Sequence, residues 1–144
     1  MALTRNATQI LWSSALTKTV SSNSATTTSD AFTFDSTDVA ALITLYASTA
    51  GTPATGDNID FYIAWTTGDV SGAGGADTFD STEHAQVLCR LDNYATDTPG
   101  EQPAQRTIPI PVAAKGFKIV AVTSAAAATR NQTFSARVMT QRAA

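Results

Sequence analysis

The chain has 144 residues, 15% of them charged, and a formal net charge of −3. This length predicts one domain that folds without a metal ion or a disulfide, and the single cysteine excludes an intrachain disulfide and a cysteine-based zinc site. No run of about 18 apolar residues is present, so we expect no membrane-spanning segment, and the N-terminus lacks the pattern of a secretory signal.

Alanine, threonine and serine dominate the composition, whereas the helix-forming residues leucine, glutamate and lysine are scarce. Threonine is β-branched and suits strands and turns. The composition therefore predicts an all-β protein.

Residues 1–30 are predicted to form a flexible N-terminal arm, joined loosely to a body over residues 31–144. Large hydrophobic residues are few in this arm, and a polar run over 21–29 follows them, too polar to bury a core. The only apolar cluster contains Ile10, Leu11, Trp12 and Leu16. We expect short strands near 10–12 and 16–20 that are ordered by packing on a neighbour.

The clearest strand in the body spans residues 57–66. Its large apolar residues occupy every second position, which places them on one face: Ile59, Phe61, Ile63 and Trp65. Further strands are predicted at 31–34, 39–48, 85–92, 106–112, 116–123 and 132–140. Residues 39–48 also suit a helix, but their β-branched residues and the breaker cluster after them favour a strand. About eight strands joined by loops predict a single-domain β-sandwich that is jelly-roll-like.

Two of these strands carry more detailed predictions. Val87, Cys89 and Leu91 alternate with polar residues, so we expect Cys89 to be a small buried hydrophobe and not a nucleophile. Pro109 and Pro111 remove hydrogen-bond donors on one side of their strand. That pattern predicts an edge strand, protected from edge-to-edge aggregation.

The loop over residues 68–83 is rich in glycine and carries the acids Asp69, Asp77, Asp80 and Glu83. Such carboxylates suit Ca²⁺ or a glycoside hydrolase, but their spacing matches no EF-hand, and any acidic loop offers such a set. The only histidine, His84, has no orienting motif near it. We therefore predict no catalytic residue, no cofactor and no bound metal, and a solvated loop that contacts a partner.

Charge is distributed unevenly along the chain. Residues 1–29 and 113–144 carry lysine and arginine but no acid, and all 12 acids lie between Asp30 and Glu101. The ordinary interpretation is a chance distribution of surface charges, and the alternative is docking against like copies or an acidic surface. Nucleic-acid binding is not expected, because the chain is acidic overall and its glycines form no phosphate-binding pattern. Tyr46 and Tyr62 leave open a carbohydrate-binding β-sandwich.

Three runs carry a resemblance to a known family: Gly56-Asp-Asn-Ile-Asp-Phe-Tyr-Ile-Ala-Trp-Thr-Thr-Gly-Asp, Asp77-Thr-Phe-Asp-Ser-Thr-Glu-His-Ala, and Ile108-Pro-Ile-Pro with Lys115-Gly-Phe-Lys. They look like small virion structural proteins of tailed bacteriophages, and most resemble capsid decoration or cement proteins. The resemblance covers roughly residues 30–140. It implies a β-sandwich, often trimeric, that sits on the outer surface of the head and bridges capsid subunits. A tail or head–tail component is the alternative within the same resemblance.

The leading hypothesis is a non-enzymatic phage head protein, made in the host cytoplasm and located on the capsid surface. Its expected partners are the major capsid protein and its own copies, as a homotrimer, with no nucleic acid and no membrane. Aromatic and aliphatic anchors dominate such contacts. The predicted partner-binding residues are Leu3, Arg5, Ile10, Leu11, Trp12, Asp69, Asp77, Asp80, Arg137 and Arg142.

Overall fold

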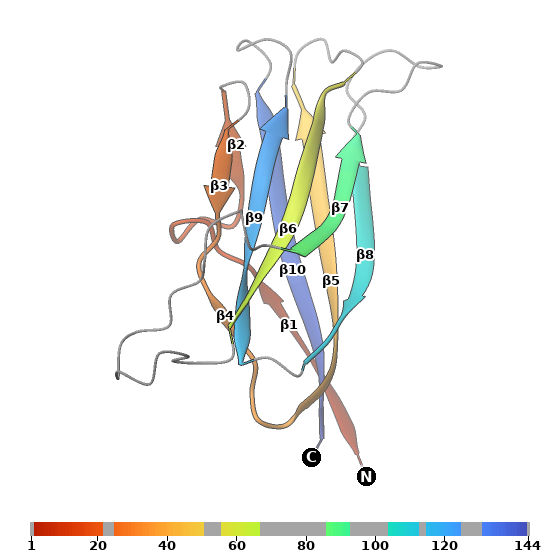
Figure 1. Cartoon of the computed structure of the whole chain (residues 1–144). Coiled ribbons are helices and arrows are strands. Elements are labelled where there is room, and N and C mark those ends of the chain that lie inside the picture. Colours follow the sequence, from red (N-terminus) through yellow and green to blue (C-terminus); the bar gives the residue numbers. More distant parts are fainter. Residues whose placement is uncertain are drawn as a thin grey trace.

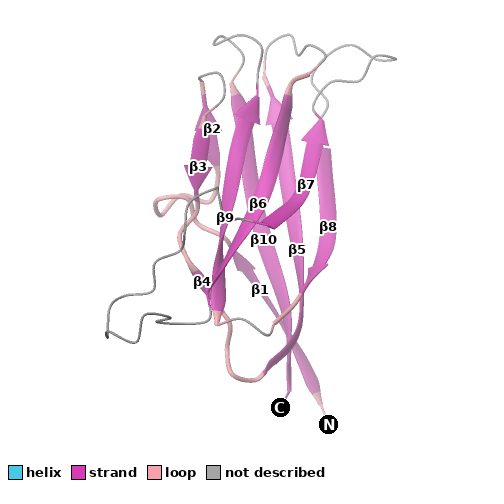
Figure 2. Cartoon of the chain, viewed as in Figure 1, coloured by secondary structure: helices cyan, strands magenta, loops and turns pink. Residues whose placement is uncertain are grey.

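The computed structural model describes residues 2–21, 25–50, 56–66, 86–92, 104–112, 115–124 and 131–143. This part of the chain contains ten strands and no helix, arranged as two antiparallel sheets (Figures 1 and 2). The first sheet contains β1 (Leu3–Gln9), β2 (Lys18–Val20), β5 (Asp38–Thr49), β8 (Ala104–Ile110) and β10 (Gln132–Ala143). The second sheet contains β3 (Thr26–Thr28), β4 (Phe32–Thr33), β6 (Asn58–Thr66), β7 (Gln86–Asp92) and β9 (Gly116–Ser124). The predicted all-β sandwich is confirmed.

The strand order is that of a jelly roll. The first sheet runs β1-β10-β5-β8, with β2 also paired to β10, and the second runs β3-β9-β6-β7, with β4 also paired to β9. The first strands of the chain thus pair with the last, and the pairs nest inward until β6 meets β7. Because β1 and β2 share one strand position and β3 and β4 share another, the fold has the eight positions of a jelly roll.

The core lies between the two sheets and follows the alternation of side chains along each strand. Ile43 and Leu45 of β5 and Phe61 of β6 are fully buried, as the period of two predicts. Phe134 of β10 lies near the centre, with its ring centroid 4.8 Å from that of Trp12 and 6.2 Å from that of Phe61. A further aromatic cluster joins Phe32, Phe34, Trp65 and Phe117.

The N-terminal segment is part of the sandwich in this structure. β1 pairs with β10 from Leu3↔Ala143 to Gln9↔Arg137, and β2 pairs with the start of β10. Between them, Ile10 and Trp12 insert into the core, with 3% and 1% of their surfaces exposed. The expected loose attachment therefore does not hold for residues 3–20, because their backbone completes the first sheet. A domain boundary at residue 30 stays a prediction.

The second sheet departs from the predicted pattern at β7. Phe61 faces Cys89 and Tyr62 faces Val87, so Leu88 is an extra residue and forms a β-bulge. Cys89 and Leu91 are buried, as predicted, and burial raises the pKa of the Cys89 thiol. Val87 was expected on the same face, but it is 69% exposed because the bulge turns it outward.

The predicted edge position of the proline-containing strand is confirmed. β8 ends the order of the first sheet, and its Pro109 lies opposite Leu42 of β5. Pro109 thus stands at the rim of the first sheet.

Candidate binding face

An apolar row crosses the outer face of the first sheet. The outward side chains of its four long strands fall in register there, one from each strand. The row contains Ala7 of β1, Met139 of β10, Leu42 of β5 and Pro109 of β8. Leu42 and Met139 are each 40% exposed, although an outward row on a solvated sheet face is ordinarily polar.

A hollow of about 770 Å³ lies over one end of this row. Its lining contains Arg5, Val39, Ala40, Ala41, Leu42, Pro109, Ile110, Pro111, Val112, Met139 and Gln141. Nine of these residues are apolar and only two carry polar side chains. We call this the larger hollow. Contiguous exposed apolar surface of this kind on a folded domain is typical of a site that binds another molecule.

The charge on this face has one sign. Arg5 and Arg137 point outward from β1 and β10, on the same side as Met139. Neither guanidinium forms an ion pair or a side-chain hydrogen bond with another described residue. The strands of this sheet contain one acid, Asp38, and its carboxylate binds Arg142. A ligand of this face is therefore expected to bring carboxylates as well as apolar groups.

A smaller hollow of about 360 Å³ continues from the apolar row toward the opposite end of the sheet. It shares Met139 with the larger hollow, and its other lining residues are Gln9, Thr44, Tyr46, Gln105, Ser135 and Arg137. The row next to the apolar one is held by a hydrogen bond of 2.8 Å between the hydroxyls of Thr44 and Thr107. The face thus changes from apolar to polar along the strands.

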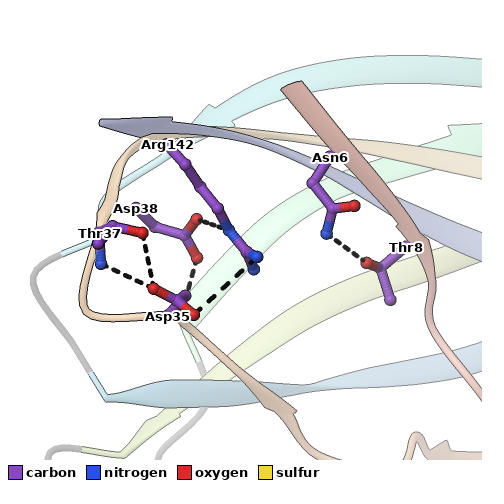
Figure 3. Close-up of polar contacts among 6 residues, drawn as sticks. All are labelled: Asn6, Thr8, Asp35, Thr37, Asp38 and Arg142. Atoms are coloured by element: carbon purple, nitrogen blue, oxygen red, sulfur yellow. Dashed lines mark hydrogen bonds and ion pairs between the residues drawn. The ribbon is translucent and has the colours of Figure 1, made fainter. Parts of the chain in front are cut away.

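A clamp of charged groups fixes the β4–β5 turn to the end of β10 (Figure 3). Arg142 Nε donates to Asp38 Oδ1 at 2.7 Å, and the backbone N–H of Asp35 donates to Asp38 Oδ2 at 2.8 Å. The side chain of Asp38 is fully buried, so these donors replace its lost hydration. The hydrogen bond to Asp38 raises the pKa of Arg142. On the neighbouring β1, Asn6 Nδ2 donates to Thr8 Oγ1 at 3.5 Å (Figure 3).

Asp35 is predicted to make the stability of the clamp depend on pH. The Thr37 hydroxyl, and then the Thr37 backbone N–H, donate to its carboxylate and hold its pKa below the ordinary 3.8. The folded state therefore binds this proton less tightly than the unfolded state, so the stabilisation is present above pH 3.8 and is lost as the pH falls below it. Thr37→Val removes the hydroxyl donor, so the variant should be less stable than the parent at pH 7, and the difference should shrink as the pH falls below 3.8.

Ser36→Ala is the control for this pair of measurements, because Ser36 lies in the same turn and its hydroxyl binds no described residue. Denaturant unfolding at pH 7 and at pH 2 measures the difference. A deficit of Thr37→Val that is equally large at pH 2 would show that the hydroxyl acts through packing and not through the charge of Asp35.

The structure divides the predicted partner-binding residues into four groups. Leu3, Arg5, Leu11 and Arg137 are exposed, and Arg5 and Arg137 border the hollows. Ile10 and Trp12 lie in the core, where no partner reaches them in this fold, and Arg142 belongs to the clamp. Asp69, Asp77 and Asp80 lie outside the described residues. Sequence reasoning missed Leu42, Pro109 and Met139, which come together only through strand register.

The described residues lack two further features. They contain no group of three or more histidine, cysteine, aspartate or glutamate side chains that could hold a metal ion. They also contain no helix that is long and apolar enough to cross a membrane.

Comparisons with known proteins identify no relative. No protein-family model matches the chain, and no curated protein sequence matches it. A chain in the structure of infectious bursal disease virus, Gx strain, is similar over 97% of this chain, with 11% identity and a TM-score of 0.46. A chain in the structure of the Gt strain is similar over 96%, with 9% identity and a TM-score of 0.40. This chain spans 32% and 36% of the lengths of those two chains.

Proposed function

We propose that the chain is a non-enzymatic structural protein of a phage particle, which binds the outside of the capsid and bridges neighbouring subunits. The observation that supports this proposal best is the apolar row on the outer face of the first sheet, with its larger hollow. Protein–protein interfaces combine such an apolar centre with a polar rim, and arginine is enriched there. The motif resemblance of residues 30–140 to decoration proteins points the same way.

The rigidity of the face suits a bridging role. Its side chains stand on strands that pair from β1 through β10 and β5 to β8, and the ladder between β10 and β5 has one register shift, between Gln141 and Arg142. The face therefore needs little ordering when a partner binds, which lowers the entropic cost of association. β10 also carries the clamp residue Arg142 at one end and the core residue Phe134 at the other. The same strand therefore connects the binding face to the core.

Binding to capsids by variants of this face tests the proposal. Leu42→Asp and Met139→Asp place a carboxylate in the apolar row, and both side chains are exposed, so the fold should survive. We expect each variant to bind capsids that lack this protein about 10- to 30-fold more weakly than the parent, the usual effect at the centre of an interface. Thr26→Asp is the control, because Thr26 is exposed on β3 of the other sheet.

The result also separates the proposal from a carbohydrate-binding role. The smaller hollow favours that second function, because it places Tyr46 beside Gln105 and Arg137. Aromatic faces and amide groups are suited to sugars. Unchanged capsid binding by Leu42→Asp and Met139→Asp would contradict the structural role. Loss of binding to glycan-coated particles in Tyr46→Ala alone would support the carbohydrate role.

A further inference from the structure

A tight turn connects the N-terminal segment, residues 2–12, to the rest of the fold. Ser13 and Ser14 form this turn, and the backbones of Trp12 and Ala15 bridge to each other on either side of it, with N–H to carbonyl distances of 2.8 and 3.2 Å. Both serines have positive φ, 52° and 69°, a region that residues with a Cβ adopt only at a cost in free energy. Among the described residues other than glycine, no further position has positive φ. The connection is therefore a strained one.

The contacts that hold the N-terminal segment are made with parts of the fold beyond this turn. Among the described strands, β1 pairs with β10 alone, at the end of the first sheet (Figure 1). The N–H of Ile10 donates to the carbonyl of Ala136 at 2.9 Å, and the ring of Trp12 packs edge-on against that of Phe134. The segment thus fills a slot formed by β10 and the core, and every copy of the chain has the same slot.

A short connection under strain favours the exchange of identical segments between copies. When the turn opens, the segment can leave its own slot and enter the slot of a second copy, where each contact forms again with the same partner residue. The bridge between Trp12 and Ala15 can also form again, now between the two copies. The difference lies in Ser13 and Ser14, whose backbones no longer need positive φ. The strain of the turn therefore favours the exchanged form over the closed monomer.

We propose that two copies of this chain exchange residues 2–12, so that β1 of each copy completes the first sheet of the other. The exchange changes the origin of the binding face. Arg5 lines the larger hollow and Ala7 belongs to the apolar row, and both lie on β1. In the exchanged dimer they come from the second copy, so each hollow is built from two chains. This inference goes beyond capsid binding and does not depend on it, because it follows from the turn and the slot.

Substitutions in the turn test the exchange, because they shift the balance between closed monomer and dimer in opposite directions. The parent should form dimers after refolding at high protein concentration. Ser13→Asn combined with Ser14→Gly supplies the residues that such a turn prefers, so the dissociation constant of the dimer should rise about 10-fold. Ser14→Val should lower it about 10-fold, because a β-branched residue disfavours positive φ. Analytical ultracentrifugation after refolding over a range of concentrations measures these constants.

A second variant weakens the turn without changing its residues. Asp30 Oδ2 accepts the backbone N–H of Ser14 at 3.1 Å, so Asp30→Ala removes a hydrogen bond of the closed form. It should lower the dissociation constant of the dimer about 5-fold, and it gives the same test if Ser14→Val does not fold. Ser36→Gly is the control, because Ser36 lies in the β4–β5 turn without positive φ, and glycine there should leave the dimer unchanged.

A disulfide distinguishes exchange from simple contact between two copies. Arg5 of β1 lies opposite Gln141 of β10, and residues that face each other on antiparallel strands are close enough for a disulfide. Chains with Arg5→Cys and chains with Gln141→Cys are refolded together and oxidised. Cys89 is buried in the other sheet and does not compete. We expect a disulfide between one chain of each kind, and less of it when both chains also carry Ser13→Asn and Ser14→Gly.

Three results would overturn the inference. They are a parent that stays monomeric after refolding at every concentration, a dissociation constant that is the same in the turn variants as in the parent, and dimers in which the two introduced cysteines do not join. Capsid binding is a separate measurement. A monomer that binds capsids through Leu42 and Met139 would reject the exchange and leave the proposed function standing, whereas an exchanged dimer that binds no capsid would do the reverse.

Discussion

Trp12→Ala is expected to lower the free energy of unfolding by about 3–5 kcal/mol, the usual cost of removing a large aromatic side chain from a core. Trp12 is 1% exposed, and its ring meets that of Phe134 edge-on, at 4.8 Å between centroids and an interplanar angle of 80°. Alanine would leave a cavity between the sheets and remove this aromatic contact. Denaturant unfolding, followed by circular dichroism, measures the change.

Two further variants in the N-terminal segment separate the core role of Trp12 from its position in the chain. Leu16 is 61% exposed, so Leu16→Ala should change the free energy of unfolding by no more than about 0.5 kcal/mol. Trp12→Phe should lower the free energy of unfolding by an amount between those of Leu16→Ala and Trp12→Ala. The indole N–H has no hydrogen-bond partner among the described residues, and phenylalanine keeps an aromatic ring in the core. Equal stability of Trp12→Ala and Leu16→Ala would mean that the segment does not pack in solution as it does here.

The burial of Trp12 shows why the N-terminal part of the fold was not predicted from the sequence. A tight turn at Ser13 and Ser14 folds the chain back, with both residues at positive φ, 52° and 69°. Such turns strongly prefer asparagine and glycine, so a pair of serines inside a polar stretch gives no signal. The turn is stabilised by a residue distant in the sequence, because the backbone N–H of Ser14 donates to Asp30 Oδ2 at 3.1 Å.

The strands of the body were predictable for the opposite reason. In β5, β6 and β10 the apolar residues alternate over many positions, so the buried face follows from local spacing alone. Pro109 in β8 and Pro111 just after it likewise marked an edge without any knowledge of its neighbours. Local patterns therefore predict which residues are strands and which side is buried.

The candidate site could not be predicted in this way, because it is a product of register. Ala7, Leu42, Pro109 and Met139 lie far apart in the sequence, and each alone is an unremarkable outward residue. The bulge that exposes Val87 depends on the single extra residue Leu88 in the pairing of β6 with β7. A shift of one residue in either sheet would exchange inner and outer faces. Of the predicted site residues, only the exposed arginines Arg5 and Arg137 border the hollows.

Gly116→Ala is expected to destabilise the fold by about 3 kcal/mol, at the upper end of the usual range for overpacking. Gly116 pairs with Thr33 where β4 meets β9, and a Cβ there would overlap the backbone oxygen of Phe32 and lie 3.2 Å from the Cα of Thr33. Both obstacles are backbone atoms, so β4 must move away from β9. Differential scanning calorimetry measures the loss, and faster hydrogen exchange on β4 locates it.

Gly56 provides a matched comparison, because the same substitution is unfavourable there for another reason. Its φ is +94°, but a Cβ would meet nothing within 4 Å. Gly56→Ala should therefore cost roughly 1–2 kcal/mol, the strain of a left-handed backbone, and Gly56→Asn should cost less, because asparagine tolerates that region. At Gly116 asparagine should be no better than alanine, since any Cβ meets the same backbone. If Gly116→Asn restored stability, backbone conformation and not close approach would be the reason for glycine at the β4–β9 contact.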